Sequence, residues 1–183
     1  MILEETGFRL RDGRGAILRS PCAADAKDLL AYIIRASGET DFLMSYPEEF
    51  DGFTLEQEEA FIDANRSSPN QLMILCLVDG RIAGNCRIAF RTGMKDRHRA
   101  AVGIAVLREF WRLGIGTRMF EEMFRAAGER GGVRQIELDF IEGNSRARSL
   151  YEKMGFRITG VRPDAIRRKD GSFANEYMMQ KRL

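Results

Sequence analysis

Two long apolar runs separated by only two residues constrain the fold of this chain more than any other feature. The runs are QLMILCLV at 71–78 and RIAGNCRIAF at 81–90. Asp79-Gly80 lies between them and suits a type I′ turn, in which both central residues have positive φ, so we expect a β-hairpin. A third apolar run, HRAAVGIAVL at 98–107, follows the turn TGMKDR. The three runs together predict an antiparallel meander.

Upstream of the meander the sequence predicts one strand and two helices. GAILRSP at 15–21 is a short apolar run that ends in proline, and apolar residues then recur at helical spacing. These residues are Ala26, Leu29, Leu30, Ile33 and Ile34. After a polar loop at 37–53, Thr54 and Gln57 have the spacing of a capping box and predict the start of a second helix.

Downstream of the meander the spacing of the apolar residues is first that of a helix and then that of a strand. The helix carries one apolar face, formed by Met119, Phe120, Met123, Phe124 and Ala127. Gly131-Gly132 ends it, and the residues of VRQIELDFI at 133–141 then alternate as in a strand. A strand–helix–strand unit of this kind favours parallel pairing with a right-handed crossover.

The last part of the chain predicts one more helix and two closing strands. Asn144 can cap a helix that ends at Gly155, and the segments 156–163 and 172–183 have the composition of strands. Asp170-Gly171 between them suits an exposed hairpin turn. We therefore expect a single domain over residues 1–183, an α/β sheet with mixed strand directions.

The bulk composition excludes several classes of function. Lys and Arg number 29 and Asp and Glu 27, a formal net charge of +2, which is too balanced to indicate a nucleic-acid or membrane surface. Three separated cysteines and one histidine, His98, support neither a disulfide framework nor a zinc site, so we expect no metal. The chain shows no pattern of a signal peptide or membrane span, and we expect a cytoplasmic protein.

Gly114 and Gly116 raise the main question about function. They lie where the last strand of the meander passes into the following helix, within FWRLGIGTRMF at 110–120. Glycines there permit positive φ and let backbone N–H groups approach a phosphate, but they are equally compatible with a tight turn. The lysine of a P-loop and the third glycine of a dinucleotide fingerprint are absent. Guanidinium groups favour the phosphate site, and three flank the turn: Arg108, Arg112 and Arg118.

Two stretches of the chain resemble the GNAT superfamily of N-acetyltransferases. They are VGIAVLREFWRLGIGTRMFEEM and IELDFIEGNSRARSLYEKMGFRITG, and the resemblance extends from about Gly15 to the C-terminus. The superfamily signature Gln/Arg-x-x-Gly-x-Gly/Ala falls on residues 111–116, where Trp111 replaces the usual Gln or Arg. Within the superfamily the chain is most similar to bacterial proteins that resemble ribosomal-protein N-acetyltransferases.

The resemblance implies a mostly antiparallel central sheet with flanking helices, in which one pair of parallel strands splays apart to hold coenzyme A. It implies an enzyme that moves the acetyl group of acetyl-CoA to a primary amine by direct attack in a ternary complex, without a cysteine nucleophile. The cofactor-binding residues that it implies belong to the strand before the signature, to the signature and to the start of a later helix. They are Ile104, Ala105, Val106, Arg112, Leu113, Gly114, Ile115, Gly116, Thr117 and Asn144.

The resemblance also implies roles in proton transfer and acceptor binding. Tyr151 in LYEKMGF is the implied general acid, because a phenol with a pKa near 10 stays protonated at neutral pH. Without the resemblance, the position of Tyr151 on an apolar helix face favours a core tyrosine. Relatives often carry a glutamate base where this chain has Ala101, so water or another group must take that proton. Glu39 and Asp41 lie in the loop that shapes acceptor pockets in this fold and are predicted to attract the amine.

Two functions of other classes stay open at this stage. One is a non-catalytic acyl-CoA-binding sensor of the same fold, and the other is a ribosome- or RNA-associated binding module, which the modest net charge disfavours. The expected partner is a small-molecule or peptide amine, with no nucleic acid and no membrane. Exposed strands at the C-terminus also predict a possible homodimer.

Overall fold

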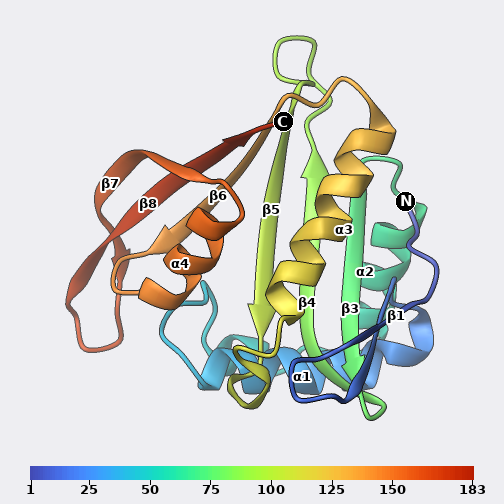
Figure 1. The fold of residues 1–183 in the computed structure, drawn as a ribbon. Helices are drawn as coiled ribbons and strands as arrows, with labels where there is room; N and C mark the ends of the chain where they lie inside the picture. Colours follow the sequence, from blue (N-terminus) through green and yellow to red (C-terminus); the bar gives the residue numbers. More distant parts are fainter.

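The three apolar runs form the centre of an eight-stranded sheet in the computed structural model, which describes residues 1–183 (Figure 1). The strands are β1 (Thr6–Arg9), β2 (Gly15–Arg19), β3 (Gln71–Val78), β4 (Arg81–Phe90), β5 (Arg99–Val106), β6 (Gln135–Ile141), β7 (Arg157–Arg167) and β8 (Phe173–Arg182). The α-helices are α1 (Ala26–Gly38), α2 (Leu55–Ser67), α3 (Ile115–Arg130) and α4 (Ser145–Lys153). Short 3₁₀ helices are η1 (Ala23–Asp25), η2 (Pro47–Phe50) and η3 (Arg108–Phe110).

The hairpin at 71–90 has the turn that the sequence predicts. Asp79 and Gly80 have φ values of 49° and 75°, as both central residues of a type I′ turn require. β3 and β4 pair antiparallel, and β4 then pairs antiparallel with β5, so the predicted meander is confirmed. Helices cover both faces of β3, which explains why its apolar residues form a continuous run instead of alternating with polar ones.

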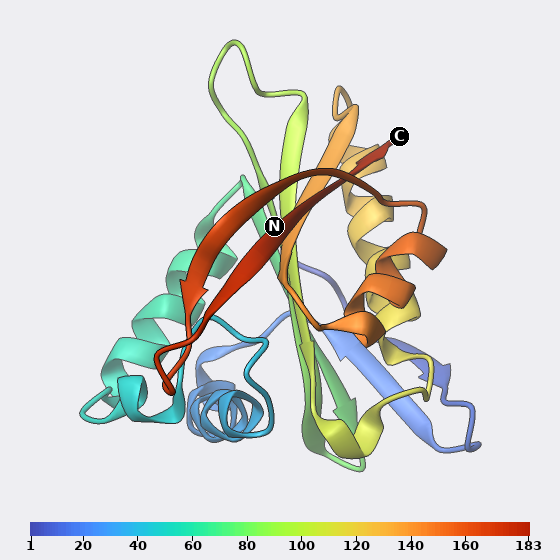
Figure 2. The ribbon, with the colours of Figure 1, turned by 90° about the vertical axis from the view of Figure 1, so that its left-hand side faces the viewer.

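The strand order is β1-β2-β3-β4-β5-β6-β8-β7, and β5–β6 is the one parallel pair. This order confirms the predicted mixed, mostly antiparallel sheet. α1 and α2 lie on one face of the sheet and α3 and α4 on the other (Figure 2). β1 was not expected from the sequence, because TGFR is too short and too polar to give a strand signal; it pairs along the edge of β2.

The helix ends follow the predicted capping signals. Thr54 Oγ1 accepts a hydrogen bond from Gln57 N at 3.3 Å, and Asn144 Oδ1 accepts one from Ala147 N at 3.2 Å. Gly131 and Gly155 follow the ends of α3 and α4 with φ values of 71° and 89°, which glycine adopts without a Cβ penalty. None of the helices combines the length and apolar character that crossing a lipid bilayer requires.

The β7–β8 hairpin projects from the far edge of the sheet, as predicted for the closing strands (Figure 1). β7 is exposed along almost its whole length, and its register with β8 shifts between Arg162 and Ile166, around Pro163. Proline and an irregular register both protect an edge strand against pairing with another chain. The homodimer stays a prediction.

Gly84 lies where β4 packs tightly against the end of β5. A Cβ atom at this position would lie 2.8 Å from the carbonyl oxygen of Ala105 and 3.1 Å from Cγ2 of Val106. The first contact is with backbone, so no side-chain rotation could relieve it. Gly84 therefore allows β4 to stay against the last residues of β5, close to where β5 leaves β6.

We expect Gly84→Ala to destabilise the protein by about 1–3 kcal/mol, because the new methyl group forces the β5 backbone to move. Gly128→Ala is the matched control: no atom lies within 4 Å of a Cβ there, and glycine in a helix interior costs about 0.5–1 kcal/mol relative to alanine, so this variant should be more stable. Urea unfolding followed by circular dichroism measures both. Equal midpoints for Gly84→Ala and the wild type would contradict the prediction.

Candidate functional site

The parallel ladder between β5 and β6 stops after three residue pairs. The last pair is Ala101 with Glu137, whereas β5 continues along β4 to Val106 and β6 continues along β8 to Ile141. Figure 1 shows the two strands close together at one end and apart at the other. A gap therefore opens through the sheet between two strands that each remain paired on their other side.

Tyr32 on α1 holds β5 to β4 beyond the split. Its hydroxyl donates to the carbonyl oxygen of Ala105 at 2.9 Å and accepts from the backbone N–H of Asn85 at 3.1 Å. The side chain is buried, and burial raises the pKa of Tyr32 well above its ordinary value, so the hydroxyl stays a donor. These bonds keep the end of β5 from following β6.

The backbone of β5 presents free groups to the gap. Leu107 N donates to Ala83 O on the β4 side at 3.0 Å, and backbone direction alternates along a strand. Ala105 therefore points its peptide groups toward β4, and Ile104 and Val106 point theirs toward the gap. Ala105 contributes only its side-chain face to the cavity, whereas Ile104 offers its backbone N–H and C=O to a ligand and Val106 its N–H, since Val106 O already accepts from Trp111 Nε1 at 2.7 Å.

A cavity of about 750 Å³ passes through the gap and is lined from both faces of the sheet. It brings together all the predicted cofactor-binding residues except Leu113, and also Glu39 and Tyr151. Leu113 packs against the core, and its carbonyl oxygen accepts from Arg11 N at 3.1 Å. Asp41 is exposed and lies outside the lining.

One end of the cavity is the turn into α3. The backbone N–H groups of residues 112–117 donate no hydrogen bond within the protein; the first that does is Arg118 N, to Gly114 O at 3.1 Å. Gly114 has a φ of 98°, which glycine adopts most readily. Gly116 serves a different purpose, because a Cβ there would lie 2.7 Å from Cδ2 of Leu150 on α4.

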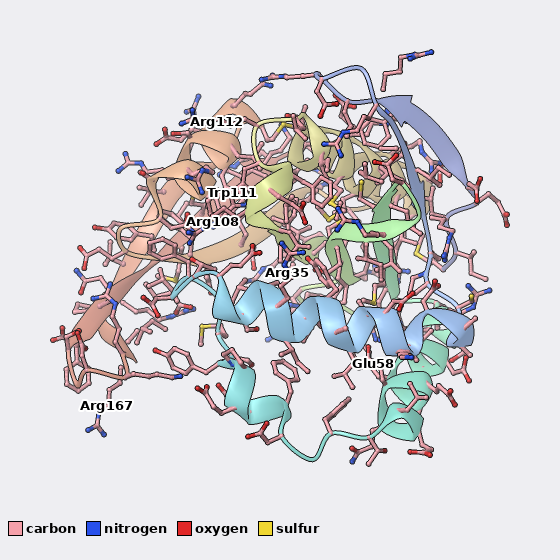
Figure 3. All side chains as sticks on the ribbon, turned by 90° about the horizontal axis from the view of Figure 1, so that it is seen from below. Arg35, Glu58, Arg108, Trp111, Arg112 and Arg167 are labelled. Atoms are coloured by element: carbon pink, nitrogen blue, oxygen red, sulfur yellow. The ribbon has the colours of Figure 1, made fainter.

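Positive side chains surround these free N–H groups. Four of them line the cavity and come from three parts of the chain, the β1–β2 turn, the turn into α3 and α4: Arg11, Arg112, Arg146 and Lys153. Arg108, Trp111 and Arg112 are grouped at the turn in Figure 3. Free N–H groups together with several guanidinium groups make this end suited to phosphate.

Tyr151 lies further along the cavity, on α4. Its ring is 7% exposed and packs against Phe120, Phe140 and Phe156. Its hydroxyl group makes no hydrogen bond within the protein although the residue lines the cavity. Burial raises the pKa of Tyr151 to about 12, so the hydroxyl is protonated at neutral pH and offers an unused O–H donor.

Asp139 is a cavity residue that sequence reasoning missed. It lies on β6 beyond the last β5–β6 pair, and strand alternation places its side chain on the opposite face from Phe140 and hence from Tyr151. Its Oδ2 atom is 3.0 Å from Nη1 of Arg162, which also pairs with Glu176. The sequence showed that polar residues alternate with apolar ones at 133–141. It did not show which of these polar residues lie beyond the last β5–β6 pair.

The carboxylate of Glu39 accepts hydrogen bonds within the protein. Its Oε2 atom accepts from Arg108 N at 2.6 Å and its Oε1 atom from Arg35 Nε at 3.0 Å. The bond from Arg108 N connects the C-terminal end of α1 to the turn before α3, and Figure 3 shows Arg35 and Arg108 on these two segments. Both carboxylate oxygens of Glu39 therefore already have partners, whereas Asp139, the other acidic residue of the cavity lining, uses only Oδ2 and keeps Oδ1 without one.

The loop between α1 and α2 covers the α1 side of the cavity with apolar side chains. Phe42, Leu43 and Met44 line it, and Met44 is 69% exposed. Near η2, Glu48 accepts from Lys169 Nζ at 2.6 and 2.8 Å, so the tip of the β7–β8 hairpin contacts this loop. The α1 side of the cavity thus combines apolar side chains with the carboxylate of Asp139, since that of Glu39 is already bonded.

The carboxylate of Glu137 holds the strands together where the ladder ends. It accepts from Arg99 Nε at 2.6 Å and Arg99 Nη2 at 2.7 Å, and also from Gln135. Burial alone would raise its pKa, but the hydrogen bonds from Arg99 and Gln135 hold the pKa of Glu137 below its ordinary value. Arg99 and Glu137 face each other across the parallel strands, so their pairing fixes where the split begins.

Comparison with known proteins agrees with this geometry. The family model described as "Acetyltransferase (GNAT) family" matches residues 39–156, more than half of the chain. An acetyltransferase of the GNAT family from Streptococcus pneumoniae has a similar structure, with a TM-score of 0.83 and 31% sequence identity over 92% of this chain and 99% of that one.

Two further proteins are similar over different extents. An N-alpha-acetyltransferase of Sulfurisphaera tokodaii is 39% identical over 60 residues, which cover 33% of this chain and 36% of that protein. A putative acetyltransferase from Salmonella typhimurium, solved with its cofactor acetyl-CoA, shares the fold, with a TM-score of 0.76 and 16% identity over 92% of this chain and 94% of that one.

We expect Glu137→Gln to lower the stability at neutral pH by about 1 kcal/mol, because a charge-assisted bidentate pair at a partly exposed site is lost. The pKa of Glu137 is lower in the folded state than its ordinary value of 4.5. The carboxylate therefore stabilises the folded state above pH 4.5, and this stabilisation is lost as the pH falls through the pKa of the folded state. The stability difference from the wild type should therefore vanish in acid.

Urea unfolding at a series of pH values measures this difference. Glu152→Gln is the control, because Glu152 forms an exposed pair with Arg148 one helical turn away, and such pairs contribute little. A difference between Glu137→Gln and the wild type that does not change with pH would refute the assigned role of the carboxylate.

Proposed function

Because the chain belongs to the GNAT acetyltransferase family, we propose that it transfers the acetyl group of acetyl-CoA to a primary amine that attacks the thioester directly in a ternary complex. The observation that carries the proposal is the gap between β5 and β6. One cavity there connects free N–H groups and arginines at one end with the unused hydroxyl of Tyr151, and it is lined from both faces of the sheet. Two substrates can therefore meet in it from opposite sides.

The residues present suit coenzyme A along the length of the cavity. The N–H groups of residues 112–117 and the nearby arginines would hold its phosphates. The free backbone groups of Ile104 and the N–H of Val106 would pair with the pantetheine arm as an added strand does. Asn144 uses Oδ1 to cap α4, so its Nδ2 group remains available to the same arm. When bound, acetyl-CoA supplies the acetyl group in activated form, as a thioester.

The cysteines support direct attack. Cys76 and Cys86 are buried in β3 and β4, and burial raises the pKa of Cys76 to about 12 and that of Cys86 further. Cys22 precedes η1 and lies outside the cavity lining. No cysteine is therefore placed to take the acetyl group as a thiolate, and the acceptor nitrogen bonds to the acetyl carbon itself.

Two side chains would complete the proton transfers from opposite faces of the sheet. Asp139 receives the proton that the acceptor nitrogen gives up as the new C–N bond forms. Tyr151 donates its proton to the sulfur as the C–S bond breaks, and then regains one from solvent. The products are the amide and the free thiol, so no redox partner is required. The N–H of Val106, at the edge of the gap, would polarise the thioester carbonyl.

The acceptor side of the cavity favours an α-amine over a lysine side chain. Ala101 cannot act as a base, and the amine must lose its proton before attack; the ordinary pKa is ~8 for an α-amine and ~10.4 for lysine. Asp139 offers one carboxylate to one ammonium group, and Phe42, Leu43 and Met44 offer apolar contact to the residue beside it. The name of the relative from Sulfurisphaera tokodaii, N-alpha-acetyltransferase, supports the same class of acceptor.

Acetyl-CoA should raise the melting temperature. A ligand at about 100 times its Kd stabilises the folded state by about 2.7 kcal/mol, which corresponds to about 5–10 °C for a chain of this size. NAD and ATP at the same concentration are controls, since they carry phosphates but no pantetheine arm. Absence of a specific shift at millimolar acetyl-CoA would refute cofactor binding.

Tyr151→Phe should lower kcat by about 100-fold or more, because the general acid is lost while the ring still packs. Asp139→Asn should lower kcat/KM at neutral pH, with part of the loss recovered at high pH, where more of the amine is already neutral. Release of the free thiol from acetyl-CoA with an alanine-terminated peptide measures both, and calorimetry should show nearly unchanged acetyl-CoA affinity.

A non-catalytic acyl-CoA sensor is the alternative that this assay separates. Such a protein would show the melting shift but no thiol release with any amine. Unchanged turnover in Tyr151→Phe would remove Tyr151 from the mechanism without affecting the cofactor assignment.

A further inference from the structure

Trp111 occupies the first position of the glycine-containing turn and is the only tryptophan of the chain. Its side chain turns back toward the sheet, and its indole N–H donates to the carbonyl oxygen of Val106 at 2.7 Å. The ring is therefore fixed to the last residue of β5, at the edge of the gap. A hydrogen-bonded ring of this size is a rigid platform at the wall of the cavity.

Arg146, in the first turn of α4, lies on this platform. Its Cζ atom is 3.4 Å from the centroid of the Trp111 ring, a stacking distance for a guanidinium group. Arg146 forms no ion pair and donates no hydrogen bond within the protein, although it lines the cavity. Its donors are thus unused, and the stack connects the turn before α3 with α4 on the other side of the cavity.

Two more guanidinium groups lie close to the first. Arg108 has its Cζ atom 5.4 Å from the centroid of the same ring, and Arg112 is the next residue of the turn. Partial desolvation and the nearby charges of Arg112 and Arg108 lower the pKa of Arg146 from its usual range. The three positive charges repel one another. None of them forms an ion pair, although Arg108 Nη2 donates to the carbonyl oxygen of Glu39, so an anion placed between them would relieve the repulsion.

We propose that Trp111 is a positioning residue that holds the guanidinium of Arg146 over the cavity, where Arg146 and Arg112 bind the phosphate end of coenzyme A. The proposal rests on the proposed function and adds to it. It gives a role to the tryptophan that replaces the usual Gln or Arg of the signature, and it adds a residue of α4 to the phosphate site. Two sources of the anion share this chemistry, the diphosphate and the 3′-phosphate.

The binding experiment compares the wild type with Arg146→Gln and Arg148→Gln. Arg148 is a matched control, because it lies two residues further along α4, is exposed, pairs with Glu152 and does not line the cavity. Calorimetric titration with coenzyme A should show about tenfold weaker binding for Arg146→Gln and no change for Arg148→Gln. Equal affinity of the two variants would overturn the proposal.

Salt dependence and conservative variants separate a phosphate contact from a general loosening of α4. The Kd of the wild type should rise more steeply with ionic strength than that of Arg146→Gln, because one screened charge contact is missing in the variant. Arg146→Lys should recover part of the affinity, since the charge remains. Equal salt slopes, or no recovery with lysine, would argue that Arg146 acts only through the fold.

The role of Trp111 is tested by a double-mutant cycle. Trp111→Leu should weaken coenzyme A binding about as much as Arg146→Gln, and the double variant should lose little more, because both changes remove the same contact. Trp111→Phe keeps an aromatic face and should lose less. Additive losses would contradict a positioning role. In the wild type, the fluorescence of the single tryptophan should change on titration with coenzyme A.

Dephospho-coenzyme A, which lacks the 3′-phosphate, distinguishes the two sources of the anion. If the loss in Arg146→Gln persists with this ligand, Arg146 contacts the diphosphate; if it disappears, Arg146 contacts the 3′-phosphate, and either result supports the proposal. A wild type that binds no coenzyme A at all would instead refute the proposed function. The two failures are therefore distinguishable.

Discussion

The early end of the β5–β6 ladder is the constraint on which the rest of the site depends. A continuous parallel ladder would close the sheet and leave no cavity, no free edge on β5 and no passage between the two faces. Two sets of bonds maintain the split. Arg99 and Glu137 hold the strands together just before it, and the hydroxyl of Tyr32 keeps Ala105 against β4 just after it. Gly84 allows the close packing of β4 and β5 that accompanies this arrangement.

Charge is distributed along the cavity in a way that matches its two proposed substrates. The end at the turn into α3 has free N–H groups and unpaired arginines, whereas the α1 side has apolar side chains and the carboxylate of Asp139. An anionic cofactor and a cationic amine would each be attracted to a different end. Tyr151, whose pKa burial raises to about 12, lies between them as a neutral donor.

Parts of the chain outside the signature support the site. Arg11, in the turn between β1 and β2, donates its backbone N–H to Leu113 O and thereby holds the turn into α3 from outside. Glu39 connects α1 to the same turn through Arg108 N. Trp111 connects it to β5 through Val106 O. The conformation of the turn, with a φ of 64° at Arg112 and 98° at Gly114, is therefore fixed by three neighbouring segments.

The sequence by itself determined the elements whose signals are local. The Asp79-Gly80 turn, the Thr54 and Asn144 caps and the glycine that ends α3 depend on a few adjacent residues, and so does the alternation of β6; all were predictable. The signature and LYEKMGF indicated the family. Only the tertiary structure decided which side chains share the cavity. Asp139 lines the cavity because β6 separates from β5 before this residue. The carboxylate of Glu39 accepts a hydrogen bond from Arg108 N, a residue far away in the sequence. β1 and the stack of Arg146 on Trp111 likewise depend on contacts between distant segments, which no local pattern encodes.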